Sequence, residues 1–156
     1  MKPNNITRLL DSRKIPYTAF ELPAEKLGAS ETAQLLNVPP EQVFKTIVVT
    51  REGKGKHILA IVPGTSEVDL KALARALGEK KVSLPTEREA ERLTGLQAGG
   101  ISPLALVNRG FQVVLDTSAQ SFEQIHISGG QRGLNILLPV SALISLTNAS
   151  VANIST

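Results

Sequence analysis

The sequence predicts an α+β fold, in which a mixed and strongly curved β-sheet has helices packed on its outside. Stretches with the composition of strands and stretches with helical spacing of apolar residues are intermingled, without the strict alternation of a doubly wound parallel sheet. Hydrophobic residues make up 42% of the 156 residues, which is enough for a packed core. A chain of this length usually folds as one unit, so we expect residues 1–156 to form a single domain.

The N-terminal part predicts two helices separated by a strand. In residues 4–16, three apolar side chains share one helical face, and Pro16 prevents extension of the helix. Residues 17–22 have the composition of a strand. A second helix is expected within residues 30–40, where Ser30 can open it and a proline pair closes it.

The next two segments, residues 44–50 and 57–63, predict a pair of strands. Both are rich in apolar and β-branched residues. The stretch that connects them, "REGKGK", carries two glycines, which favour a tight turn. We therefore expect a β-hairpin at this point of the chain.

The C-terminal half predicts further helices and strands. The helices over residues 69–78 and 86–95 each have a capping residue at the start and a glycine at the end, and Thr86 and Glu89 have the spacing of a capping box. Three strands and a last short helix are expected at residues 111–118, 123–128, 134–139 and 140–146. The small, polar tail from about residue 147 is expected to be loosely ordered.

Composition narrows the class of function. The chain has no cysteine, which excludes disulfides and thiolate nucleophiles, and neither His57 nor His126 has metal-site spacing, so we expect no metal and no cofactor. Aromatic residues make up only 3% of the chain, too few for the stacking rows of single-strand binders. A net charge of +3 is too mild for a DNA-binding protein. No segment has the features of a signal peptide or a membrane span, so we expect a cytoplasmic protein.

Lys45 stands out because it lies inside an apolar strand. Strand alternation places Lys45 on the same face as Ile47 and Val49. Two interpretations are open. The lysine could protect an exposed sheet edge against aggregation, or it could point into a pocket.

Two glycine-rich loops form the second group of candidate site residues. Residues 127–133, "ISGGQRG", match neither a P-loop nor a dinucleotide-binding fingerprint, yet their N–H groups could bind an anion together with Arg132. Residues 99–103, "GGISP", could supply N–H groups to an oxyanion. A hairpin turn and an ordinary loop are the alternatives. Asp116 is compatible with a turn former or with a carboxylate at a pocket mouth, and we interpret His57 and His126 as structural.

Four stretches taken together carry a family resemblance. In this order, "FKTIVV", "GGISPL", "LDTS" and "SGGQRGL" resemble the YbaK-like aminoacyl-tRNA deacylases, which are free-standing relatives of the editing domain of bacterial prolyl-tRNA synthetases. The resemblance covers nearly the whole chain. It implies a barrel-like sheet surrounded by helices, and an enzyme that cleaves the ester between a mischarged amino acid and the tRNA 3′ end. It also implies mischarged tRNA as a partner, and prolyl-tRNA synthetase as a further one.

The same resemblance assigns roles to individual residues. Lys45 would neutralise the 3′-terminal phosphate or polarise the ester carbonyl, and the N–H groups of the "GGISP" loop would hold the carbonyl oxygen. The residues expected to be catalytic are Lys45, Gly100, Ile101 and Ser102. The residues expected to bind substrate are Leu22, Gly99, Pro103, Asp116, Ser128, Gly129, Gly130 and Arg132.

The sequence leaves the substrate and the attacking group open. Gln131 stands where the family usually has a lysine, and Leu22 where an aromatic residue is common. Cys-tRNA(Pro) is the expected substrate and Ala-tRNA(Pro) its rival. No side chain resembles a strong nucleophile, so either water or the thiol of the substrate would attack the ester. For the same reason, a non-catalytic module that binds aminoacyl-tRNA or a nucleotide and docks on a synthetase is the alternative function.

Overall fold

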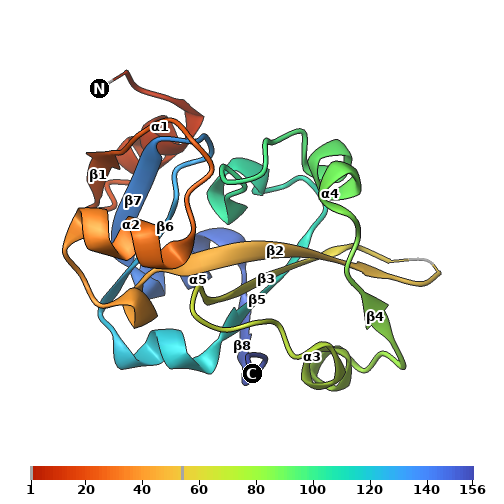
Figure 1. Ribbon diagram of the computed structural model, residues 1–156. Helices are drawn as coiled ribbons and strands as arrows, with labels where there is room; N and C mark the ends of the chain where they lie inside the picture. Colours follow the sequence, from red (N-terminus) through yellow and green to blue (C-terminus); the bar gives the residue numbers. More distant parts are fainter. Residues whose placement is uncertain (1, 54) are drawn as a thin grey trace.

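The computed structural model describes residues 2–53 and 55–156 and has the α+β architecture that the sequence predicts (Figure 1). The strands are β1 (Thr18–Glu21), β2 (Phe44–Arg51), β3 (Ile58–Pro63), β4 (Val82–Ser83), β5 (Gln112–Asp116), β6 (Gln124–Ser128), β7 (Leu134–Pro139) and β8 (Ser150–Ala152). The α-helices are α1 (Asn5–Ser12), α2 (Ala29–Leu36), α3 (Leu70–Leu77), α4 (Glu87–Thr94) and α5 (Val140–Thr147). Short 3-10 helices are η1 (Pro40–Gln42), η2 (Pro103–Leu106) and η3 (Thr117–Ser121).

The described strands form two sheets, one with the order β1–β7–β6 and one with the order β4–β2–β3–β5–β8. The smaller sheet is antiparallel. In the larger sheet, β2 and β3 form the expected antiparallel hairpin, while β3–β5 and β5–β8 pair in parallel. The larger sheet is therefore mixed, as predicted. Part of the connection expected to form the hairpin turn, at Lys54, lies outside the described residues.

The two faces of β2 pack against different hydrophobic clusters. Phe44 and Val48 belong to the main core, which also contains the apolar face of the smaller sheet. Val49 belongs to a second cluster, together with Leu73 of α3. The alternation of faces expected for this strand is thus confirmed, and β2 lies between the two clusters.

The two sheets meet beside the start of β2, where Val43 forms a parallel bridge with His126 of β6. On its other side Val43 accepts a hydrogen bond from the N–H of Gly64, directly after β3, at 2.8 Å. The bridge therefore lies on the edge of β2 that faces away from β3. On that same edge β4 pairs only with Thr50 and Arg51, at the far end of β2. Between these two contacts, no strand of the described chain pairs with the edge of β2, so strand pairing is interrupted there.

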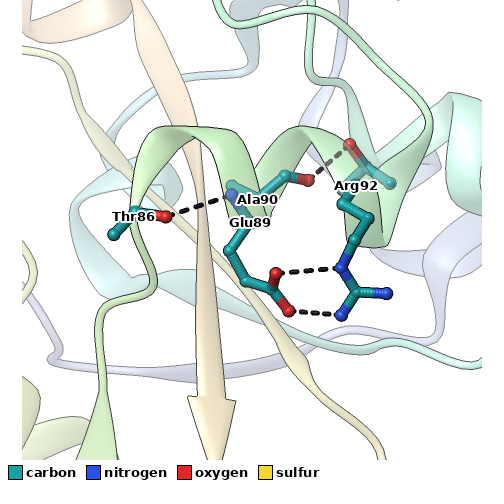
Figure 2. A network of polar contacts seen from close by, with 5 residues as sticks. Thr86, Glu89, Ala90 and Arg92 are labelled. Atoms are coloured by element: carbon teal, nitrogen blue, oxygen red, sulfur yellow. Dashed lines mark hydrogen bonds and ion pairs between the residues drawn. The ribbon is translucent and has the colours of Figure 1, made fainter.

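The helices are short. α3 and α4 begin and end at the capping residues that the sequence predicts, whereas α2 begins after Gly28 and not at Ser30. Each α-helix has 8 residues, and no helix within the described residues could span a membrane. Figure 2 shows the start of α4, where the N–H of Glu89 donates to the hydroxyl of Thr86 at 3.1 Å. The carboxylate of Glu89 contacts the guanidinium of Arg92 instead of returning to Thr86. The expected capping box is therefore only half formed.

The expectation of a loosely ordered tail is wrong. Residues 150–152 form β8, which pairs in parallel with β5, and Ile154 is fully buried. One carboxylate oxygen of Asp116 accepts hydrogen bonds from the N–H groups of Ile154 at 2.9 Å and Ser155 at 3.1 Å. The polar composition of the tail is compatible with order, because the sheet and a buried carboxylate form hydrogen bonds with the N–H and C=O groups of its backbone.

Candidate functional site

A pocket of about 570 Å³ lies at the interrupted edge of β2. Its wall includes Thr46 of β2, Leu84 after β4, and Ser128 and Asn135 of the smaller sheet. The carbonyl of Val43 points toward β3, and successive residues of a strand direct their backbone groups to opposite edges. The N–H and C=O of Thr46, three residues later, therefore point toward the open edge. The pocket thus combines apolar and polar side chains with backbone groups that no neighbouring strand pairs, a combination typical of small-ligand sites.

Lys45 lines this pocket. Its side chain is 29% exposed, and its ammonium lies 3.3 Å from a carboxylate oxygen of Glu67, whose own side chain is 82% exposed. A pair this open to water is weak, so the ammonium can exchange Glu67 for an anionic group of a ligand. Lys45 lies both on the strand with the open edge and in the pocket wall.

The "GGISP" loop contributes two of its residues to the pocket wall, Gly99 and Ile101. Within the described chain, no hydrogen-bond acceptor is in range of either N–H. The N–H of Gly100 already donates to the carbonyl of Gln97 at 2.8 Å, so it is not free to hold an oxyanion in this conformation. Ser102 is fully buried, and its hydroxyl accepts from the N–H of Leu104. Ser102 and the buried Pro103 thus shape the loop from behind.

The "SGGQRG" stretch is the turn of the β6–β7 hairpin. The N–H of Gly129 donates to the carbonyl of Leu134 at 2.8 Å, and a Cβ at Gly129 would lie 2.4 Å from the Leu134 side chain. Gly130 has φ +93°, and a Cβ there would lie 2.8 Å from Ile6. Both glycines therefore allow close packing inside the protein, whereas Ser128 at the end of β6 lines the pocket.

The two glycine-rich loops contact each other. A Cβ at Gly100 would lie 2.8 Å from the Cα of Gln131. Arg132 donates through its Nε to the carbonyl of Ala98 at 2.6 Å. The loops form one joined unit beside the pocket, and the guanidinium of Arg132 partly serves to hold that unit together.

Leu22 lines the pocket, but Asp116 does not. Asp116 is 1% exposed, and its carboxylate binds Ser118 as well as the N–H groups of the C-terminal tail. Burial by itself would raise the pKa of Asp116, but the hydrogen bonds from Ser118, Ile154 and Ser155 outweigh it and hold the pKa below its ordinary value. The structure therefore corrects the expectation of a pocket carboxylate, because Asp116 anchors the tail.

Asn135 is a pocket residue that sequence reasoning missed. It is 5% exposed, and its Oδ1 lies 2.7 Å from Nδ1 of His126, which is 1% exposed. Burial lowers the pKa of His126 below its ordinary value, in spite of the hydrogen bond with Asn135. The signal was present, because the stretches "QIHIS" and "LNILLP" place polar residues on one strand face in alternation with core residues. In the described part of the chain, no three His, Asp or Glu side chains gather as metal ligands would.

Comparisons with known proteins show the family of this chain. Residues 24–146 match the family model of the aminoacyl-tRNA editing domain. The chain belongs to this family. It is 36% identical over 154 residues to EbsC of Enterococcus faecalis, whose name provisionally assigns it deacylation of Cys-tRNA(Pro) and Cys-tRNA(Cys), with 97% of this chain and 93% of EbsC covered.

Two further relatives of the editing-domain family cover most of the chain. Identity to the prolyl-tRNA editing protein ProX of Acetoanaerobium sticklandii is 25% over 146 residues, which covers 90% of this chain and 87% of ProX. A crystal structure described provisionally as a trans-editing enzyme for prolyl tRNA synthetase superposes with a TM-score of 0.80 at 25% identity, with 99% of each chain covered. The resemblance and the fold class inferred from the sequence are thereby confirmed.

Proposed function

We propose that this protein is a trans-editing aminoacyl-tRNA deacylase, which cleaves the aminoacyl ester of mischarged tRNA and acts on Cys-tRNA(Pro). The observation that supports this most directly is that the ammonium of Lys45 and the loop residues Gly99 and Ile101 line one pocket in a member of the editing-domain family. The names of EbsC and ProX favour tRNA(Pro) as the carrier. Prolyl-tRNA synthetase, which charges that tRNA, is the proposed partner.

The size of the pocket limits what can enter. A volume of about 570 Å³ suits a small ligand such as the aminoacylated terminal nucleoside and is too small for the rest of the tRNA. The ester would thus be bound at the 3′ end alone, with the acceptor stem outside. Lys45 would neutralise the terminal phosphate or polarise the carbonyl.

Charge that develops on the ester oxygen requires donors placed in advance. The N–H groups of Gly99 and Ile101 take this role in our proposal, in place of the already bonded N–H of Gly100. One donor of this kind is worth roughly 3 kcal/mol in the transition state. An aminoacyl ester is already activated, so a site with few such groups is sufficient.

The attacking group is not supplied by an obvious side chain. Ser102 is buried and caps η2, and the hydroxyl of Ser128 accepts a hydrogen bond from the N–H of Gly130 at 3.2 Å. Either water attacks the carbonyl carbon, or the substrate's own thiol does. In the second case the sulfur bonds to the carbonyl carbon, the bond to the ribose oxygen breaks, and the thiol proton ends on that oxygen.

Deacylation rates of Cys-tRNA(Pro), Ala-tRNA(Pro) and Pro-tRNA(Pro) test the proposal. We expect cleavage of Cys-tRNA(Pro) to be fastest and Pro-tRNA(Pro) to be spared. Faster cleavage of Ala-tRNA(Pro) would change the assigned substrate and keep the class of enzyme. Binding of all three without any cleavage would instead show the non-catalytic module.

A further inference from the structure

The side of the smaller sheet that faces away from the main core holds a buried polar group. Ser128 pairs directly with Asn135, and His126 pairs with Leu137, so His126 and Asn135 are diagonal neighbours on one face. The alternate residues Ile125, Ile127 and Ile136 are fully buried in the core on the opposite face. His126 and Asn135 are also buried, although they face the pocket side, so their polar atoms need partners.

His126 fixes which atoms of Asn135 remain available. An amide oxygen can only accept, so the 2.7 Å contact requires Nδ1 of His126 to carry a hydrogen and donate it to Oδ1. The imidazole is further held by packing against Phe20, with ring centroids 5.6 Å apart. Oδ1 thereby has a hydrogen-bond partner, and the NH₂ group of Asn135 remains without one within the described chain. No acceptor among the described residues is in range of this group, although Asn135 is 95% buried and lines the pocket.

Ser128 supplies a second donor beside the first. Its hydroxyl oxygen already accepts from Gly130, which leaves the hydroxyl hydrogen free to donate into the pocket. Directly opposed residues of an antiparallel pair have Cβ atoms roughly 5 Å apart. Asn135 and Ser128 thus present two neutral donors side by side.

Two adjacent neutral donors select a particular chemistry. The NH₂ group of Asn135 cannot accept a hydrogen bond from the ammonium of an amino acid, and a phosphate is better matched by Lys45 on the other part of the wall. A pair of neighbouring neutral oxygens is what they complement best, and the terminal ribose of a tRNA carries such a pair at its 2′ and 3′ positions.

We propose that Asn135 and Ser128 bind the 2′ and 3′ oxygens of the terminal ribose, and that His126 is the positioning residue that orients Asn135. This inference rests on the proposed function, since the ribose that Asn135 and Ser128 would bind is part of the same tRNA substrate. It predicts that the pocket distinguishes ribose from deoxyribose.

Direct binding of nucleosides tests this without any need for cleavage. Dissociation constants for adenosine, 2′-deoxyadenosine and 3′-deoxyadenosine would be measured by calorimetry or NMR titration. The wild type should lose about tenfold in affinity on removal of either hydroxyl, the usual effect of one neutral hydrogen bond. Asn135→Ala should become insensitive to one hydroxyl and Ser128→Ala to the other. The exposed Asn153→Ala and Ser145→Ala are matched controls that should retain both sensitivities.

The role of His126 requires a separate comparison. His126→Phe keeps an aromatic ring against Phe20 but removes the donor, so the sensitivity that depends on Asn135 should fall. His126→Asn places a donor near the former Nδ1 position and should restore it. Retention of full sensitivity in His126→Phe would contradict the positioning role.

The outcomes separate this inference from the proposed function. A wild type that binds adenosine and both deoxynucleosides equally, or binds none of them, overturns the inference even if it deacylates Cys-tRNA(Pro). Ribose sensitivity without deacylation overturns the proposed function alone. If Asn135→Ala fails to fold, Ser128→Ala decides, because this half-buried position tolerates the loss of a hydroxyl more easily.

Discussion

The position of Lys45 is compatible with both of the roles that the sequence left open. It lies on β2, the strand whose outer edge stays open, and its side chain lines the pocket that this opening creates. Its partner Glu67 is largely exposed, so the ion pair contributes little to the free energy of folding. The ammonium would therefore contribute to ligand binding and not to stability.

Replacement of Lys45 should affect activity and leave stability almost unchanged. We expect Lys45→Ala to lower the deacylation rate on the order of 100-fold, since one preorganised electrostatic contact is typically worth that much. Its thermal midpoint should stay close to that of the wild type. The exposed Lys71→Ala on α3 is the matched control and should retain full activity. A fully active Lys45→Ala enzyme would leave only the edge role.

A second prediction at the scale of single residues concerns the close packing at Gly100. A Cβ there would lie 2.8 Å from the Cα of Gln131 and 3.0 Å from the backbone N of Arg132, and backbone cannot move aside as a flexible side chain can. Overpacking of this kind costs roughly 1–3 kcal/mol, so Gly100→Ala should lower the free energy of unfolding in urea by that amount. Gly28→Ala is the control, because its Cβ would find only Glu31 at 3.6 Å. An unchanged Gly100→Ala would show that the two loops separate easily.

Sequence reasoning identified the glycines but could not show what they pack against. Gly100 meets Gln131, 31 positions later in the chain, and no local pattern indicates such a contact. For Asn135, the alternation of polar residues marked one face of the strands, but the sequence could not show that Asn135 contacts His126 on the neighbouring strand. Lys45 could be singled out even though its partner was unknown, because a lysine between apolar strand residues is unusual.

The C-terminal strand shows how one carboxylate can order an element. Asp116 at the end of β5 binds the backbone of residues 154 and 155, and the carbonyl of Ile154 in turn accepts from the N–H of Asp69 at 2.7 Å. Thr156 also donates its N–H to the carbonyl of Glu67, the residue paired with Lys45. The short β8 was not predictable, because a strand of three residues leaves no periodic pattern.

Asp116→Asn should destabilise the fold in a pH-dependent manner. The folded pKa of Asp116 lies below the ordinary value of 3.8, so its carboxylate stabilises the fold above that value, and this stabilisation is lost as pH falls through the lowered pKa. At pH 7 we expect the variant to lose about 2 kcal/mol of unfolding free energy in urea. The difference from the wild type should shrink as pH falls below 3.8.

The exposed Asp11→Asn on α1 serves as the control and should change little at either pH. A loss of stability in Asp116→Asn that stays constant down to low pH would point to packing instead of charge. Equal stability of variant and wild type at pH 7 would contradict the anchoring role of Asp116.

At the scale of the whole molecule, the site exists because the sheet is not continuous. The sequence predicted the longer strands and a mixed sheet, since these follow from composition and from connections that are not strictly alternating, but it predicted neither the two-residue β4 nor β8. It could not place the gap between β6 and β4, because that gap depends on where Val43 bridges to His126. Local reasoning could not choose between the alternatives for these residues, whereas the resemblance named Leu22, Lys45, Gly99, Ile101 and Ser128 as site residues, and these line the pocket.

The last prediction concerns how the whole molecule meets tRNA. The net charge is only +3, so affinity depends on where the basic groups lie. Gln131 is exposed in the β6–β7 turn beside the pocket loops, and Gln131→Lys should add one phosphate contact. Affinity for tRNA should then rise, and the slope of log affinity against log salt should steepen by about 0.7–0.9.

The control is Gln120→Lys in η3, which adds the same charge outside the lining of the pocket. Equal effects of the two variants on affinity and slope would show a response to net charge alone, and the turn would then have no specific part in binding tRNA.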